Sequence, residues 1–180
     1  MNYRSLNDLN ATIRSSLSRI PHDFDVVVGI PRSGLLPASL VALYLNKRLA
    51  DLHGFISGTT LDGGARFHER YTRAINLTSV KALLVDDSIR TGTQIAKTRQ
   101  LINDAGLSGS TRIFCVFSSP NSTGLVDHFG EVCDLPRVFE WNIMHNIHLR
   151  NACVDIDGVL CRDPFPEEND DGVRYERFLE

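Results

Sequence analysis

The sequence predicts an α/β domain in which a mostly parallel central sheet is flanked by helices. Three short apolar runs, at residues 25–30, 81–87 and 111–119, have the composition of buried strands. Stretches with helical periodicity alternate with these runs along the chain, which is typical of parallel sheets. The loops that follow parallel strands share one edge of the sheet, and ligands bind there.

The first helix is predicted at residues 4–19, where apolar residues recur at helical spacing and Pro21 ends the pattern. The helix after the first strand is predicted at residues 35–46, a segment that is apolar nearly all round and therefore buried. Pro37 lies in its first turn, where a missing N–H group is tolerated.

The middle of the chain contains a weaker strand pattern and a long polar segment. A strand is expected at residues 50–57, and residues 58–73 are expected to form a long, mobile, functional loop. A helix is predicted at residues 92–105, because its apolar residues share one face and Gly106 follows it. A further strand is expected within residues 132–140.

Composition excludes several classes of protein. The chain has 180 residues, of which 42% are hydrophobic and 23% charged, as in ordinary globular domains. A net charge of −3 indicates no nucleic-acid partner, and no apolar run is long enough for a membrane span or a signal peptide. The cysteines lack metal-binding spacing, so we interpret them as reduced, mostly buried thiols of a cytoplasmic protein: Cys115, Cys133, Cys153 and Cys161.

The strongest functional signal is the segment LLVDDSIRTGTQ at residues 83–94. A buried strand brings Asp86 and Asp87 to the sheet edge, and a helix begins shortly afterwards. A helix start offers free N–H groups and partial positive charge to a phosphate, and Gly92 permits close approach. Two acids beside a phosphate suit a ligand that also carries hydroxyls or a cation, such as a ribose 5-phosphate. The alternative is that these polar residues only cap the helix.

The segment VDDSIRTGT resembles the signature of the type I phosphoribosyltransferases. GIPRSGLLPA, after the first strand, is similar to the pyrophosphate loop of that family, particularly in its xanthine and orotate branches. The resemblance covers roughly residues 20 to 150. It implies a Rossmann-like fold with a small hood. It also implies Mg²⁺-dependent transfer of the phosphoribosyl group of phosphoribosyl pyrophosphate (PRPP) to a ring nitrogen of a nucleobase, with release of pyrophosphate.

The resemblance also implies roles for individual residues. Asp86 and Asp87 would hold the ribose hydroxyls of PRPP, and Mg²⁺ largely through PRPP. The residues implied to bind the phosphate of PRPP are Ser88, Ile89, Arg90, Thr91, Gly92, Thr93 and Gln94. Those implied to bind pyrophosphate are Pro31, Arg32, Ser33 and Gly34. The catalytic candidates in the flexible loop at residues 58–73 are Arg66 and His68, with Glu69 and Arg70 beside them. The alternative for His68 is an ordinary solvated side chain.

Two positions depart from the family pattern. Gln94 stands where a Thr or Ser is usual, which removes one phosphate donor. Similar purine-salvage members place Asp at the position of Arg90, against the base. An Arg cannot accept a proton there, so an orotate-like or unusual acceptor is favoured over a purine. The alternative is that Arg90 points to solvent.

The hood is expected at residues 135–146, which resemble the C-terminal segment of the xanthine branch. Trp141, the only tryptophan, would stack on the base there. The alternative is that it belongs to the core. A homodimer is usual in the family. A PRPP- or nucleotide-sensing regulator without turnover is the alternative to an enzyme, although the charged flexible loop favours an enzyme.

The last thirty residues differ in character, and we predict a boundary between 1–150 and 151–180. An apolar strand at residues 151–160 contains VDIDGVL, which is similar to the opening motif of the haloacid dehalogenase superfamily. That likeness would make Asp155 a nucleophile and Asp157 an acid–base group. Too few residues follow for a second domain, so phosphatase activity is not expected. We favour the truncated start of a fused phosphatase-like domain; the alternative is a strand that joins the first domain's sheet.

Overall fold

A computed structural model of the chain describes residues 1–61, 63, 73–145, 153, 157, 161–169 and 172–180. Its contacts divide the chain into two units, Met1–Ile143 and Met144–Glu180. The larger unit contains the predicted sheet and all the residues between the first strand and the hood.

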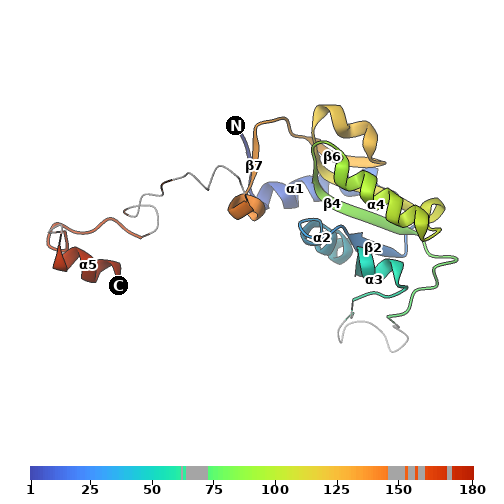
Figure 1. Cartoon of the computed structure of the whole chain (residues 1–180), viewed down its shortest axis with the longest axis horizontal. Coiled ribbons are helices and arrows are strands. Elements are labelled where there is room, and N and C mark those ends of the chain that lie inside the picture. Colours follow the sequence, from blue (N-terminus) through green and yellow to red (C-terminus); the bar gives the residue numbers. More distant parts are fainter. Residues whose placement is uncertain (62, 64–72, 146–152, 154–156, 158–160, 170–171) are drawn as a thin grey trace. The chain divides into compact units, whose positions relative to one another are not determined.

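The larger unit is built on a five-stranded sheet whose neighbouring strands are all parallel (Figure 1). The order of the strands across the sheet is β3 (Arg48–Asp51), β2 (Val26–Gly29), β4 (Ala82–Ile89), β5 (Thr111–Ser118) and β6 (His128–Val132). The chain leaves β2 for β3 on one side and then returns to β4 on the other. The strand order therefore changes direction between β2 and β4, which is the point where open α/β sheets bind ligands.

Helices cover both faces of this sheet. α1 (Leu6–Ser16) and α2 (Leu35–Leu45) share a core with Val27 and Leu83. α3 (Leu52–Ile56) and α4 (Thr93–Asp104) share the opposite core with Val28 and Leu84. Successive strand residues thus point to opposite faces, as the pleat of a strand requires. The predicted fold class is confirmed.

A small second sheet joins the two ends of the larger unit. β1 (Asn2–Arg4) pairs in parallel with β7 (Arg137–Phe139), and Arg4 Nη2 lies 2.5 Å from Glu131 Oε1. β7 leads directly into a 3₁₀ turn at Glu140–His145. The chain start therefore helps to fix the strand from which this turn emerges.

The predicted strand at residues 50–57 is wrong over most of its length. β3 ends at Asp51, and α3 begins at Leu52. The Asp51 carboxylate accepts the N–H of Gly54 at 2.9 Å, which caps the helix and stops the strand.

Two other predicted elements have different bounds. The helix predicted at residues 4–19 begins later, because Ser5 and Asp8 form a capping box, and a 3₁₀ turn (Leu17–Arg19) follows it. The region 132–140 contributes the short β7 and the end of β6 rather than one strand. Residues 133–136 separate the two strands, and the Leu135–Pro136 peptide bond among them is cis.

The predicted loop at residues 58–73 and the predicted tail strand at 151–160 lie mostly outside the described residues. In the smaller unit, α5 (Val173–Leu179) places the Tyr175 hydroxyl 2.7 Å from Asp157 Oδ1. Asp155 is outside the described residues.

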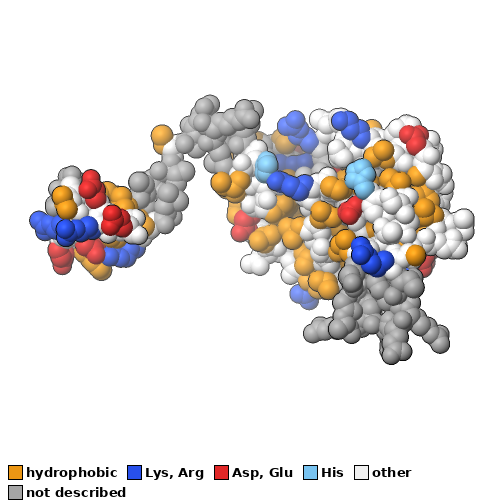
Figure 2. Space-filling model, turned by 60° about the horizontal axis from the view of Figure 1, so that its bottom comes forward, with side chains coloured by type: hydrophobic (Ala, Val, Ile, Leu, Met, Phe, Trp, Pro, Cys, Tyr) orange, Lys and Arg blue, Asp and Glu red, His pale blue; other side chains and the backbone are white. Residues whose placement is uncertain are grey.

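The structure also shows how the charged side chains and the cysteines are distributed between surface and core. On the face of the larger unit seen in Figure 2, basic side chains are separated by apolar and uncharged ones. No helix in the described part of the chain is long and apolar enough to cross a membrane. Cys115 and Cys133 are buried free thiols, whereas Cys153 is exposed.

The central strand should be far more sensitive to truncation than the helix surface. Leu84 is fully buried in β4, so Leu84→Ala should lower the free energy of unfolding by about 2–5 kcal/mol. Leu43 is 78% exposed on α2, so the same change there should cost less than about 0.5 kcal/mol. Urea denaturation of both variants tests this, and equal losses would contradict the assigned core.

Candidate functional site

Segments that follow three strands meet at the carboxyl edge of the sheet. β2 leads into residues 31–34, β4 into residues 90–92, and β5 into Ser119. Because the strands are parallel, these segments lie on the same edge, around the change of direction between β2 and β4. The predicted pyrophosphate and phosphate segments are therefore neighbours in the fold.

Asp86 and Asp87 lie inside this edge, in the last part of β4, and both are buried. Burial, and then the neighbouring Asp87, raise the pKa of Asp86 to about 8. Burial also raises the pKa of Asp87, while the hydrogen bond from Trp141 opposes that increase. Without a ligand the pair resists carrying two negative charges. A ligand that brings hydroxyl donors or a cation would favour the ionised form.

The segment after β4 forms the turn that opens α4. Gly92 is the N-cap of this helix and has a φ of 79°. A Cβ atom on Gly92 would also come within 2.5 Å of Leu125 Cδ1, so conformation and space both require glycine. The hydroxyl oxygens of Thr91 and Thr93 lie 3.0 Å apart.

The backbone amides of this turn are available to a ligand. Among the hydrogen bonds of the described residues, none has the N–H of Arg90, Thr91 or Gly92 as its donor. A hollow of about 80 Å³ is lined by residues 86 and 88–95. The start of α4 adds partial positive charge, so the hollow has the chemistry of an anion site.

Residues 31–34 pass close to the acid pair. A Cβ atom on Gly34 would lie 2.6 Å from the Val85 carbonyl oxygen and 3.1 Å from Asp86 Cα. Only glycine lets this segment approach the end of β4 so closely. The Pro31–Arg32 peptide bond in the same segment is cis.

The turn at Glu140–His145 connects these segments. Trp141 Nε1 and Asn142 Nδ2 donate to Asp87 Oδ2 at 2.7 and 3.0 Å. Asn142 Oδ1 accepts from Arg32 Nη2 at 3.1 Å and from Ser33 Oγ at 2.9 Å. One amide side chain therefore bridges the second acid and the predicted pyrophosphate segment.

Trp141 has an aromatic neighbourhood of its own. Its ring stacks on Phe139 and Phe117, with centroid distances of 4.9 and 6.0 Å, and it packs partly against the core. Its indole edge is directed at Asp87. The predicted stacking on a base is not tested by these contacts.

The structure thus gathers most of the residues predicted for the site, but not all. Arg66, His68, Glu69 and Arg70 lie outside the described residues. Arg90 is exposed, as are Thr91, Thr93 and Gln94. Sequence reasoning missed Asn142, Ser119, Ser122 and Arg137. A usable signal existed for the serines, because SSPNS directly follows a buried strand and therefore lies at the ligand edge.

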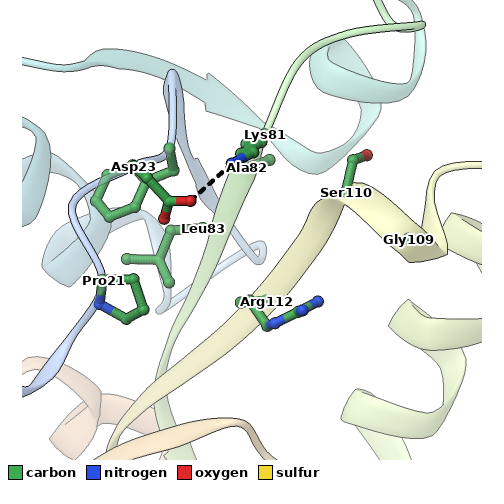
Figure 3. Close-up of a pocket in the computed structure, with 9 residues that line it drawn as sticks. Pro21, Asp23, Lys81, Ala82, Leu83, Gly109, Ser110 and Arg112 are labelled. Atoms are coloured by element: carbon green, nitrogen blue, oxygen red, sulfur yellow. Dashed lines mark hydrogen bonds and ion pairs between the residues drawn. The ribbon is translucent and has the colours of Figure 1, made fainter.

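Larger hollows lie elsewhere in the larger unit. One of about 290 Å³ lies at the amino ends of β4 and β5, where Lys81 Nζ is 2.7 Å from Asp23 Oδ2 (Figure 3). None of the predicted site residues lines it. A still larger hollow, of about 440 Å³, lies between α4 and the strands β4 and β5, and it too contains none of the predicted site residues. The size of a hollow therefore does not point to the predicted site, whereas the acid pair and the unpartnered amides lie together at the carboxyl edge.

Comparison with known proteins agrees with this geometry. The sequence model of the phosphoribosyl transferase domain matches residues 3–146. The chain belongs to the phosphoribosyltransferase domain family. Two curated relatives are similar to this phosphoribosyltransferase domain. "Xanthine-guanine phosphoribosyltransferase" of Chromohalobacter salexigens is 31% identical over 61% of this chain and 62% of its own length. "Transcriptional regulator GfcR" of Halobacterium salinarum is 28% identical over 68% of this chain and 57% of its own length.

The phosphoribosyltransferase fold is also seen in a solved structure. The purine phosphoribosyltransferase of Pyrococcus horikoshii superposes with a TM-score of 0.57 at 18% identity, over 78% of this chain and 92% of that one. At this identity the likeness shows the fold alone.

The buried acid pair predicts a particular pH dependence of stability. The folded pKa of Asp86 is raised to about 8, so the free energy of unfolding should fall as the pH rises from about 4 to about 8. Asp86→Asn removes this ionisation. At pH 8.5 the free energy of unfolding of the variant should exceed that of the wild type by on the order of 2 kcal/mol. Urea unfolding at several pH values measures this difference.

The matched control is Asp104→Asn, which removes an exposed carboxylate at the end of α4. Its stability should follow that of the wild type across the same range. If the free energy of unfolding of Asp86→Asn has the same pH dependence as that of the wild type, the pKa of Asp86 is not raised and this prediction is wrong.

Proposed function

We propose that the protein transfers the phosphoribosyl group of PRPP, with Mg²⁺, to a ring nitrogen of a nucleobase and releases pyrophosphate. The observation that carries the proposal is the position of Asp86 and Asp87 between the free amides of residues 90–92 and the segment 31–34. This arrangement repeats the order of groups in PRPP, in which a phosphate, ribose hydroxyls and a diphosphate follow one another.

The phosphate half of the site would be formed by Ser88 to Gln94. The amides of residues 90–92 would donate to the 5-phosphate of PRPP, together with the hydroxyls of Thr91 and Thr93. Ile89 is buried, so its contribution is through the backbone. Arg90 and Gln94 are exposed beside the hollow and can reach outward.

The diphosphate half would be formed by Pro31, Arg32, Ser33 and Gly34. Arg32 and Ser33 both donate to Asn142 Oδ1 in the free protein. A diphosphate oxygen would replace that amide oxygen as their acceptor, with the stronger, charge-assisted hydrogen bonds that an anion provides.

The acid pair fits a cation that arrives with its ligand. In the described part of the chain, no group of three or more His, Cys, Asp or Glu side chains could hold a metal ion. Asp86 and Asp87 would therefore share Mg²⁺ with oxygens of PRPP rather than hold it alone. Bound there, Mg²⁺ would supply charge stabilisation to the leaving diphosphate.

The reaction needs little covalent chemistry from the protein. Cleavage at ribose C1 develops positive charge on the sugar and negative charge on pyrophosphate. Arg32 is placed to stabilise the leaving group, and the predicted Arg66 and His68 would act from the 58–73 loop. Closure of that loop would exclude water from the cationic sugar. Trp141 is proposed to provide a flat surface for the base.

Position 90 bears on the acceptor. An exposed Arg beside the phosphate hollow can pair with an anionic ring, as in orotate, but cannot accept a proton from a purine. The similarity to a protein named xanthine-guanine phosphoribosyltransferase favours a purine instead. We infer a nucleobase acceptor. The pyrophosphate-release assay described below distinguishes an orotate-like ring from a purine.

A regulatory module is the second candidate. The match to a transcriptional regulator at 28% identity supports it. Asp87 also accepts hydrogen bonds from Trp141 and Asn142, and a sensor could use the exchange of these bonds for bonds to PRPP. A sensor would bind PRPP without consuming it.

Pyrophosphate release separates these two functions. The full chain is incubated with PRPP and Mg²⁺ and one of orotate, uracil, adenine, hypoxanthine, guanine or xanthine. Release that depends on one base supports the proposed transferase and identifies its acceptor. Binding of PRPP by calorimetry without release for any base supports the sensor, and absence of binding contradicts both.

The acid pair should decide PRPP affinity in either case. Asp86→Asn together with Asp87→Asn keeps the shape of the site but removes both charges, so the Kd for PRPP with Mg²⁺ should rise at least about tenfold. Calorimetry measures this, with Asp104→Asn as the control that changes an exposed carboxylate. An unchanged Kd in the double variant would exclude the acids from the ribose site.

A further inference from the structure

We propose that Ser119, Ser122 and Arg137 are positioning residues that hold the phosphate loop in its anion-binding conformation. They do this by fixing two consecutive backbone carbonyls of the loop on the side opposite to the ligand. This inference rests on the proposed function, because it concerns the loop that would receive the 5-phosphate of PRPP.

The two carbonyls belong to Ile89 and Arg90. The Ile89 oxygen accepts the N–H of Ser119 at 3.0 Å and Arg137 Nη2 at 2.8 Å. The Arg90 oxygen accepts Ser122 Oγ at 2.5 Å. Ser119 Oγ lies 2.9 Å from the same oxygen and 2.9 Å from Ser122 Oγ, so its single proton serves one of them.

These donors are held firmly. Ser119 and Ser122 are 6% and 2% exposed. Arg137 also donates to the Cys133 carbonyl at 2.9 Å, and its guanidinium lies 5.3 Å from the centre of the Phe139 ring. The donors come from the end of β5, from the 3₁₀ turn Pro120–Leu125 and from β7, so separate parts of the fold converge on one turn.

Because of peptide geometry, fixing the two carbonyls also orients the N–H groups that would bind the ligand. In a trans peptide the C=O and the following N–H point in opposite directions. Fixing the carbonyls of Ile89 and Arg90 therefore fixes the N–H groups of Arg90 and Thr91 on the other side. Those same N–H groups have no described partner and border the hollow next to Asp86.

The asymmetry between acceptors and donors is what indicates a functional role. Arg90 and Thr91 are exposed, so their N–H groups are open to solvent or to a ligand, whereas the two carbonyls are bonded to buried serines and to Arg137. Here two donors lie within hydrogen-bond distance of each carbonyl oxygen, while the N–H groups of the same two peptides, those of Arg90 and Thr91, have no described partner. Rotation of either peptide would turn a carbonyl toward the phosphate and repel it.

The test uses the two halves of PRPP as separate probes on the full chain. Ser119→Ala with Ser122→Ala should raise the Kd for ribose 5-phosphate at least about tenfold, because the loop amides are no longer pre-oriented. The Kd for pyrophosphate with Mg²⁺ should stay within about twofold, since the 31–34 segment is untouched. Calorimetry gives both constants, and circular dichroism confirms that the variant is folded.

The matched control is Ser118→Ala. Ser118 is equally buried, but its hydroxyl donates to the Ser119 carbonyl at 3.1 Å rather than to the loop. It should leave both Kd values within about twofold of the wild type. If the double variant does not fold, Ser122→Ala alone replaces it, with an expected loss of about threefold for ribose 5-phosphate only.

The outcomes are distinct. Wild-type protein that binds neither ribose 5-phosphate nor PRPP would overturn the proposed function and this inference with it. Wild-type binding with an unchanged affinity in the folded serine variant would overturn this inference alone. Equal weakening of both probes would also overturn it, because the effect would then be general rather than on the loop.

Discussion

Two adjacent carboxyl groups buried at the end of a central strand impose the main constraint on this structure. Asp86 and Asp87 lie in the last part of β4, the strand that leads into the proposed phosphate-binding segment, and β4 is next to β2, which leads into the 31–34 segment. In water the pair would ionise readily, but burial raises both pKa values. The two carboxyl groups therefore need hydrogen-bond donors, a bound proton or a ligand to compensate for their burial. The elements at this edge of the sheet provide such donors.

The turn at Glu140–His145 supplies hydrogen-bond donors to this pair. Trp141 and Asn142 donate to Asp87, and Asn142 in turn accepts from the 31–34 segment. The neighbouring loop has the opposite arrangement, with its carbonyls occupied and its amides free. At one part of the edge the polar groups thus bond to one another, and at the other the loop amides have no described partner. That combination agrees with the proposed ligand, PRPP, in which ribose hydroxyls lie between a phosphate and a diphosphate.

Sequence predicted what is encoded locally. The strands around Val28, Leu84 and Phe114 were evident from short apolar runs, and Asp86 to Gly92 form one continuous motif. Asn142, Ser119 and Arg137 were not predicted, because their partners lie between 29 and 110 residues away and depend on the fold. The strand at 50–57 failed because one carboxylate, Asp51, caps a helix inside an otherwise strand-like run. The sequence predicts Trp141 as an aromatic platform, but nothing near it in the sequence indicates that its indole N–H contacts Asp87.

Proton release on ligand binding tests the central claim most directly. At about pH 8 the phosphates of PRPP are already ionised, whereas burial and Asp87 raise the pKa of Asp86 to about 8, so that part of the protein keeps a proton on this carboxyl. Calorimetry of PRPP with Mg²⁺ in buffers of different ionisation enthalpy should therefore show a net release of protons on binding, which Asp86→Asn abolishes. Binding without proton release, or release that persists in the variant, would contradict the assignment of this acid pair to the ligand site.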